Sequence, residues 1–270
     1  MSNSHVSKSS VRSALATCVL LLASMTTGLP SAQAAPARGL DAILAAGTLR
    51  VGTTGDYKPF TFRNADGSYE GFDIDRAEAL GKALGVKVLF VQTKWADLLK
   101  DFEADKFDVA MGGISVTLPR QKAGYFSSPY MREGKAAIAR CADAAKYGSL
   151  AAIDAKGVRV IVNPGGTNEA FDKARLHAAT VVMNKDNLSI FDRLAKGDAD
   201  VMITDASETR YQQKLHKGAL CAIHPGHPFD FAEKAYLLPR DTPLKMFVDQ
   251  WQHIDENDGA FAAETAKWFQ

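Results

Sequence analysis

The chain has 270 residues, of which 46% are hydrophobic and 23% charged, and its formal net charge at pH 7 is +1. A near-neutral charge without a long basic run argues against a nucleic acid or a membrane surface as the partner. The length suits one or two domains of ordinary size, each able to bury a hydrophobic core.

The first 34 residues have the features of a cleaved export signal. Lys8 and Arg12 supply positive charge, residues 14–29 are apolar and uncharged, and residues 32–34 (Ala-Gln-Ala) place small side chains where a signal peptidase reads them. We therefore predict export and cleavage after Ala34. An uncleaved membrane anchor is the alternative, and it is disfavoured because the apolar run is shorter than the ~20 residues that a spanning helix needs.

Two cysteines, Cys141 and Cys221, follow the predicted signal. In a compartment that oxidises thiols we favour a disulfide between them, although the sequence leaves two buried free thiols open. Cys221, His224 and His227 are spaced like metal ligands, but the prolines among them indicate a plain loop and no fourth ligand is evident. We predict no metal site.

Strand-like and helix-like patterns alternate after the signal. Asp73 resembles the N-cap of a helix, and Trp95, Leu98, Leu99 and Phe102 repeat with the spacing of one helix face. In chain order the pattern predicts a strand at 49–53, a helix at 74–84, a strand at 86–91, a helix at 95–102 and a strand at 108–111.

The second half of the chain repeats this alternation. It predicts strands at 158–162, 180–183 and 201–204 and helices at 167–177, 188–196 and 206–215. An apolar stripe from Leu244 to Ile254 predicts a long helix, and a last short helix ends at Phe269. Such alternation predicts an α/β fold with mostly parallel sheets flanked by helices.

One internal similarity suggests how this alternation is organised. Residues 102–111 resemble residues 194–203, because in each a helix ends and an aspartate, Asp108 or Asp200, opens a short apolar strand. The offset is too long for a solenoid repeat, so we predict two similar lobes.

Three loops that follow predicted strands hold the polar residues of interest, at 55–60, 112–120 and 163–169. Ligands bind at the carboxyl ends of strands in open α/β sheets. In the second loop, Ser115 and Thr117 can donate hydrogen bonds and Arg120 can grip a carboxylate with two parallel ones. The alternative is that Thr117 only caps a helix and Arg120 is solvated.

The third loop also favours an anionic ligand. Gly165 and Gly166 let the backbone approach a ligand closely, and the free N–H groups at the following helix start attract an anion. An ordinary glycine-rich turn is the alternative. Together the loops predict a small carboxylate ligand held between the lobes.

Several runs resemble a known family. They are Gly-Phe-Asp-Ile-Asp at 71–75, Gly-Ile-Ser-Val-Thr at 113–117 with Arg120, and Tyr-Phe-Ser-Ser-Pro-Tyr at 125–130. In order and spacing they are similar to the periplasmic polar-amino-acid solute-binding proteins of family 3, over essentially all of the chain after the signal.

This resemblance implies a periplasmic protein of two α/β lobes joined by two crossing strands, near 135–140 and 228–234. Residues 35–137 and 232–270 would form the first lobe and residues 138–231 the second. In the family, the residue matching Arg120 holds a ligand α-carboxylate, that matching Asp205 holds an α-ammonium, and that matching Trp95 packs on the side chain.

Within this family, the runs at 53–60, 161–169 and 228–241 resemble the cyclohexadienyl dehydratases, which also have cysteines at the positions of Cys141 and Cys221. That resemblance implies conversion of prephenate to phenylpyruvate and of arogenate to phenylalanine, with loss of water and carbon dioxide and without a cofactor. The alternative is a non-catalytic amino-acid-binding component of an ABC importer, whose partner would be a permease.

The resemblance assigns the general acid to Glu169, which otherwise is an ordinary first-turn helix glutamate. Asp56 would orient the leaving hydroxyl or a water, or else merely cap its turn. For Lys58 and Asn163 the sequence favours a role in the site and a place on the surface equally. The expected substrate-binding residues are Tyr57, Trp95, Ser115, Thr117, Arg120, Gly166, Thr167, Asn168 and Asp205. At Thr117 some dehydratases would have asparagine, whereas the binding proteins favour threonine.

Overall fold

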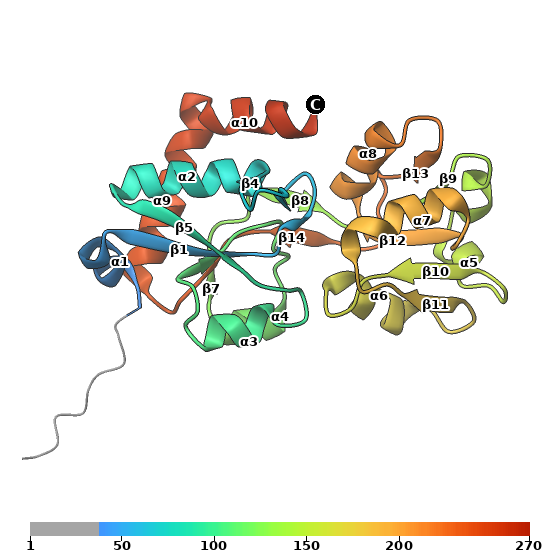
Figure 1. The fold of residues 1–270 in the computed structure, drawn as a ribbon, viewed down its shortest axis with the longest axis horizontal. Helices are drawn as coiled ribbons and strands as arrows, with labels where there is room; N and C mark the ends of the chain where they lie inside the picture. The colour runs from blue at the N-terminus through green and yellow to red at the C-terminus, as the bar shows by residue number, and fades with distance from the viewer. Residues whose placement is uncertain (1–37) are drawn as a thin grey trace, which may run out of the picture. The chain divides into compact units, whose positions relative to one another are not determined.

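The computed structural model describes residues 38–270, so the predicted export signal and its cleavage site lie outside the described residues. Two five-stranded sheets, each flanked by helices, form two lobes (Figure 1). The predicted two-lobed α/β class is therefore confirmed. No helix within residues 38–270 is long and apolar enough to cross a membrane.

The first lobe is built around the sheet β5-β1-β6-β15-β7, in which β1 runs parallel to β5 and β6, and β15 runs antiparallel to β6 and β7. Its elements before the crossing are α1 (Leu40–Ala46), β1 (Thr48–Thr53), β2 (Asp56–Tyr57), β3 (Thr61–Arg63), β4 (Tyr69–Glu70), α2 (Phe72–Leu84), β5 (Lys87–Gln92), α3 (Leu98–Glu103), β6 (Val109–Ala110), α4 (Leu118–Ala123) and β7 (Tyr125–Phe126). Those after the return are β15 (Leu237–Leu238), α9 (Thr242–Asp258) and α10 (Ala260–Phe269).

The second lobe is built around the sheet β11-β10-β12-β9-β13, in which β10 runs parallel to β11 and β12, and β9 runs antiparallel to β12 and β13. Its elements are β9 (Lys135–Arg140), η1 (Ala144–Tyr147), α5 (Leu150–Ile153), β10 (Arg159–Val162), α6 (Thr167–Arg175), β11 (Thr180–Met183), η2 (Asn187–Ser189), α7 (Ile190–Lys196), β12 (Val201–Asp205), α8 (Ala206–Leu215) and β13 (Leu220–Ile223).

The chain crosses between the lobes through a two-stranded antiparallel ladder, β8 (Met131–Glu133) with β14 (Ala232–Lys234). The ladder lies a few residues before the first predicted crossing at 135–140, because those residues form β9 inside the second sheet.

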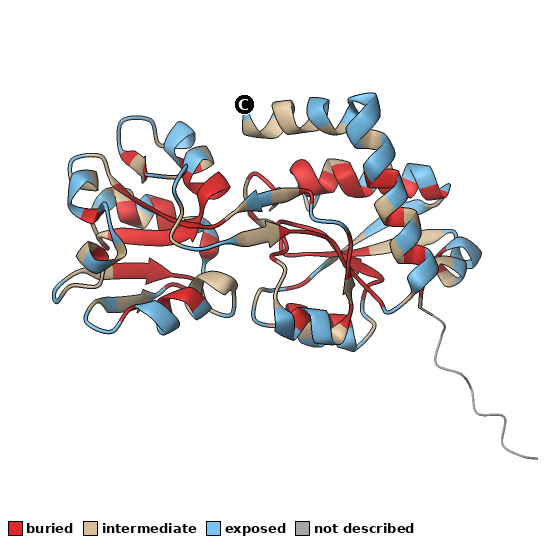
Figure 2. Ribbon diagram, turned by 180° about the vertical axis from the view of Figure 1, so that it is seen from behind, coloured by how far each residue is buried: buried red, intermediate tan, exposed pale blue. Residues whose placement is uncertain are grey.

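The C-terminal helices complete the core of the first lobe, which Figure 2 shows as buried strands beneath partly exposed helices. The ring of Phe269 lies 5.4 Å from that of Phe60 and 5.2 Å from that of Phe72, between centroids. The fully buried Arg76 of α2 reaches Asp255 at 2.8 Å and Glu264 at 2.9 Å. The first lobe is therefore discontinuous in sequence.

The predicted similarity between the lobes extends to a pair of matching ion pairs. Asp108 accepts hydrogen bonds from the backbone N–H of Arg50 at 2.8 Å and from its Nη2 at 2.6 Å. Asp200 accepts the same two bonds from Arg159, at 2.9 and 2.7 Å. In each lobe the aspartate before one central strand thus holds the arginine of its neighbour.

Cys141 and Cys221 form a disulfide, as favoured from the sequence. It joins the end of β9 to β13, which are already paired in the second sheet. Because the sulfur of Cys221 is bonded to that of Cys141, it cannot also be the thiolate ligand of the metal site considered with His224 and His227.

Two local predictions were wrong. Gly71, not Asp73, precedes α2, and the buried Asp73 carboxylate accepts hydrogen bonds from the N–H groups of Gly112 and Gly113 and from the hydroxyl of Tyr130. Burial raises the pKa of Asp73 to about 6 despite these hydrogen bonds. Trp95 precedes α3 instead of belonging to it, and its indole N–H donates a hydrogen bond to Asp56.

Candidate functional site

A small cavity of about 20 Å³ lies where strand ends of the two lobes meet. Seven of its lining residues were predicted: Tyr57, Trp95, Ser115, Gly166, Thr167, Asn168 and Asp205. The other four are Gly113, Asn163, Asn187 and Lys234. Because a ring-bearing ligand needs several times this room, binding requires the lobes to separate or the lining side chains to move.

Asp205, at the end of β12, is the electrostatic centre of this cavity. Its Oδ1 lies 2.6 Å from Nζ of Lys135 and its Oδ2 lies 2.5 Å from Nζ of Lys234, while Tyr57 donates its hydroxyl proton to Oδ2. Burial by itself raises the pKa of Asp205, but the two lysines outweigh it and hold that pKa well below its usual range. The carboxylate is therefore ionised and fully paired.

Both lysines are buried, with 3% of Lys135 and 0% of Lys234 exposed. Lys135 also donates to Thr167 Oγ1 at 2.9 Å and Asn168 Oδ1 at 2.5 Å, at the start of α6. Lys234 donates to Ser115 Oγ and to the carbonyl of Gly113, each at 3.0 Å. The pair thus ties the second and third loops to Asp205.

Sequence reasoning missed both lysines. The available signal was a single lysine beside an apolar strand, Lys135 before Ala-Ala-Ile-Ala and Lys234 before Ala-Tyr-Leu-Leu. A lysine in such a place is rarely buried without a partner.

Arg120 lies in α4 with only 8% of its surface exposed. Its Nη1 donates to the carbonyl of Ser115 at 2.8 Å, and within residues 38–270 no carboxylate forms a salt bridge with it. Burial lowers the pKa of Arg120 to about 10, so it remains charged at neutral pH. Thr117 instead caps α4 through its hydroxyl, as in the alternative considered above, and does not line the cavity.

Two glycines allow the loops to come together. Gly165 has φ +86°, and a Cβ there would lie 2.3 Å from Cα of Ala96 in the other lobe. Gly113 has φ +70°, and a Cβ there would lie 2.4 Å from the ring of Tyr57. A side chain at Gly165 would push its loop away from Ala96, and a side chain at Gly113 would push its loop away from Tyr57.

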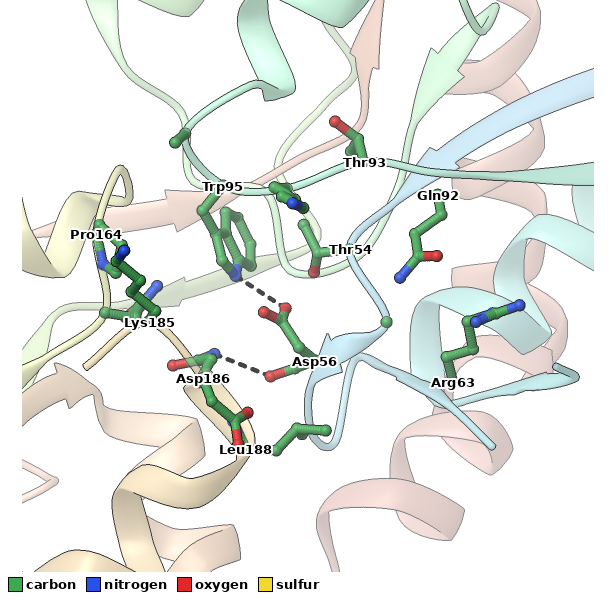
Figure 3. Close-up of a pocket in the computed structure, with 15 residues that line it drawn as sticks. Thr54, Asp56, Arg63, Gln92, Thr93, Trp95, Pro164, Lys185, Asp186 and Leu188 are labelled. Carbon is green, nitrogen blue, oxygen red and sulfur yellow. Dashed lines mark hydrogen bonds between the residues drawn. The ribbon is translucent and has the colours of Figure 1, made fainter. Parts of the chain in front are cut away.

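A wider pocket of about 350 Å³ lies beside the cavity and shares Trp95, Asn163 and Asn187 with it (Figure 3). There the indole N–H of Trp95 donates to Oδ1 of Asp56 at 3.0 Å, and Nδ2 of Asn187 donates to the backbone carbonyl of Asp56 at 2.9 Å. Burial raises the pKa of Asp56. The pocket thus borders the cavity at Trp95, Asn163 and Asn187.

Glu169 lies in the first turn of α6, directly after the cavity-lining residues 166–168, but does not itself line the cavity. Its carboxylate is 2.6 Å from Nζ of Lys173 and also accepts the N–H of Gly165 at 2.6 Å. These contacts, the lysine first, lower the pKa of Glu169. Lys58 lies farther away, with Nζ 3.7 Å from the ring centre of Phe62.

One more buried acid lies behind Asp205. Glu208, 2% exposed, accepts the hydroxyl of Thr204 at 2.5 Å, and burial raises its pKa to about 8. At neutral pH it is mostly protonated, so it adds little negative charge to the cluster.

Comparison with known proteins places this site in context. A cyclohexadienyl dehydratase from Pseudomonas aeruginosa is 51% identical over 253 residues, which cover 94% of this chain and 92% of that protein. The L-cystine-binding protein TcyJ of Escherichia coli is 28% identical over 225 residues, or 83% of each chain.

Among solved structures, the ancestral amino acid-binding protein AncCDT-1, a precursor of cyclohexadienyl dehydratase, is 36% identical with a TM-score of 0.79, covering 86% of this chain and 99% of that one. An ancestral cyclohexadienyl dehydratase is 49% identical with a TM-score of 0.54, covering 86% of this chain and 97% of that one. The model of the bacterial extracellular solute-binding proteins, family 3, matches residues 49–270. The chain is therefore an exported protein and belongs to the family-3 bacterial extracellular solute-binding proteins.

Proposed function

We propose that this protein is a cyclohexadienyl dehydratase that converts prephenate to phenylpyruvate and arogenate to phenylalanine. The observation that carries the proposal is the position of Glu169, one residue beyond the cavity-lining segment 166–168, in a chain 51% identical to a protein with that name. An acid at the edge of a cavity that is lined by the buried Lys234 suits a dianionic substrate.

The reaction asks little of the protein. Glu169 gives its proton to the ring hydroxyl, the C–O bond breaks, and water leaves. The bond to the ring carboxylate then breaks to release carbon dioxide, and its electron pair completes the aromatic ring. Glu169 regains a proton from solvent, so the overall step consumes one proton and needs no cofactor.

The other side chains hold the substrate in place. Arg120 binds a carboxylate through its guanidinium, and Tyr57 and Trp95 form the walls around the ring. Their rings lie 5.5 Å apart at 86°, which gives the cavity a right-angled apolar corner. Asp56, at the end of the Trp95 hydrogen bond, orients the leaving hydroxyl or the departing water.

Glu169 must be protonated and turned toward the cavity before it can act. Leaving Lys173 and Gly165 removes both contacts that lower its pKa, and the negative substrate raises it further. The exposed position of Lys173 makes this ion pair inexpensive to break.

We place the mature protein in the periplasm, with cleavage near Ala34. Its ligand is a small molecule, and under this proposal it acts without a membrane partner. The relative named as an L-cystine-binding protein favours a second candidate, the non-catalytic component of an importer with a permease partner.

The deciding experiment incubates the purified mature protein with prephenate and follows phenylpyruvate absorbance. Turnover that falls in Glu169→Gln supports the dehydratase. A protein that shows no turnover but binds an amino acid tightly is the importer component. Asp56→Asn is the companion variant, and a loss as large as that of Glu169→Gln would move the acid to Asp56.

A further inference from the structure

The cluster around Asp205 has consequences for the group that a ligand carries next to its α-carboxylate. The carboxylate of Asp205 accepts three hydrogen bonds, from Lys135, Lys234 and Tyr57. All of these donors are at least 96% buried, so water does not compete for them. A ligand ammonium would bring further donors to an acceptor that is already surrounded.

The charge in the cluster leads to the same conclusion. Lys234 is shared between Asp205 and the more distant Glu133, whose Oε1 lies 3.6 Å from Nζ. Even with Glu133 ionised, two carboxylates meet two ammonium groups, and the buried Arg120 adds one more positive charge. Glu208 does not reverse this excess, because its pKa of about 8 keeps it mostly protonated at pH 7.

Release of either lysine from Asp205 is unfavourable. Burial lowers the pKa of Lys234, but the charges of Asp205 and Glu133 outweigh burial and raise it. An ammonium seated on Asp205 would have to displace a charged lysine into the protein interior, which costs more than the new pair returns. A keto oxygen, in contrast, is an acceptor. Nζ of Lys234, which lines the cavity, can turn one N–H to it from Ser115 or from the carbonyl of Gly113 without leaving Asp205.

We infer that Asp205 serves here as the fixed counter-ion of Lys135 and Lys234, and that the two lysines make the site selective for α-keto acids over the corresponding α-amino acids. The inference rests on the proposed function and narrows it, because prephenate then becomes the preferred substrate and arogenate the poorer one. Lys135 and Lys234 are the specificity-determining residues.

The test compares two ligands that differ only at this position, phenylpyruvate and L-phenylalanine, by calorimetry with the purified mature protein at pH 7. We expect phenylpyruvate to bind at least ~10-fold more tightly, since a single desolvated charge contact changes affinity by about that factor. Equal affinities, or tighter binding of phenylalanine, would overturn the inference.

Variants show whether the lysines are the cause. Lys135→Met frees one oxygen of Asp205 and should reduce the preference for phenylpyruvate by about fivefold or more. Lys146→Met is the matched control, because it removes an exposed lysine that pairs with Asp143 far from the cavity, and it should leave the preference unchanged. A preference that survives in Lys135→Met and Lys234→Met alike contradicts the role of the lysines.

Turnover is measured in a separate assay, so that the dehydratase activity and the keto-acid selectivity can each be rejected independently of the other. Absence of activity on both prephenate and arogenate, together with a preference for phenylpyruvate, rejects the dehydratase and supports keto-acid selectivity. Activity on prephenate with equal binding of the two ligands rejects the selectivity and supports the dehydratase. We expect the activity arm to show a higher kcat/KM for prephenate than for arogenate.

Discussion

Oε1 of Glu169 lies 2.6 Å from Nζ of Lys173, one turn further along α6. The ion pair lowers the pKa of Glu169 and holds its side chain at the rim of the cavity instead of inside it. Under the proposed function, Lys173 competes with the substrate for this carboxylate, and the protonation of Glu169 depends on which of the two it contacts.

For Glu169→Gln we expect kcat to fall by about 10²–10⁴-fold, because the amide keeps the size of the side chain but cannot donate the proton. KM should change little, as for an interaction used in the transition state. Steady-state kinetics on prephenate measure both. A variant that turns over at nearly the wild-type rate would exclude Glu169 as the acid.

Lys173→Met gives the complementary result. The wild-type kcat should fall as pH rises through the pKa of Glu169, since only the protonated acid is active. Removal of the lysine removes the largest cause of the lowered pKa, so this fall should move to higher pH. A kcat–pH profile that is identical in both proteins contradicts the competition between Lys173 and the substrate.

Arg120→Ala should weaken substrate binding by about 2–3 kcal/mol, or roughly 30- to 150-fold in KM, because it removes a charge-assisted contact in a desolvated site. Arg132→Ala is the control, since Arg132 pairs with Glu233 with 80% of its side chain exposed. An unchanged KM in Arg120→Ala would refute the carboxylate-binding role.

Glu208→Gln tests the buried acid through stability. The pKa of Glu208 is raised from 4.5 to about 8 in the folded protein, so the wild type loses stability as pH rises through that window. Between pH 6 and pH 9 the loss is on the order of 3 kcal/mol. Gln keeps an oxygen for the Thr204 hydroxyl and does not ionise, so its melting temperature should decline less between pH 6 and pH 9. A parallel decline in both proteins contradicts the raised pKa.

Reduction of the Cys141–Cys221 bridge should lower the melting temperature, because the bridge spans a sequence separation of 80 residues in the unfolded chain. The chain-entropy model puts the effect at about 4 kcal/mol. Thermal unfolding with and without reductant measures it. Two thiols that react with Ellman's reagent in unreduced, unfolded protein would show that the bridge is absent.

Much of the fold was predictable because its helices and strands carry clear periodicity. The helix predicted at 206–215 agrees with α8 at both ends, and the strand predicted at 180–183 agrees with β11. Strands of two or three residues, such as β2, β7 and β15, were missed because so short a segment has no measurable alternation.

Site residues were easier to predict from the sequence where the local pattern gave them no other role. They were harder to predict where the same residue also fitted a structural role, such as a helix cap. Asp73 satisfies the pattern of an N-cap, yet its carboxylate faces inward to two N–H groups from a distant loop, a contact that depends on tertiary packing. Lys135 and Lys234 lie 99 positions apart in the sequence and meet only at Asp205. The pattern of neighbouring residues in the sequence carries no information about a contact between residues so far apart.

The discontinuity of the first lobe also affects how the exported chain folds. All strands of the second sheet lie between residues 135 and 223, so that segment emerges from the export channel with its own sheet complete. The first lobe must wait for Phe269, whose ring packs on Phe60, which in turn stacks 5.1 Å from Tyr57 in the cavity wall. Until the last helix has crossed the membrane, Phe60 and Phe72 lack the packing of Phe269, and they are exposed to proteases and to other unfolded chains. The second lobe can therefore finish folding before the first lobe does, although the first lobe begins to cross the membrane earlier.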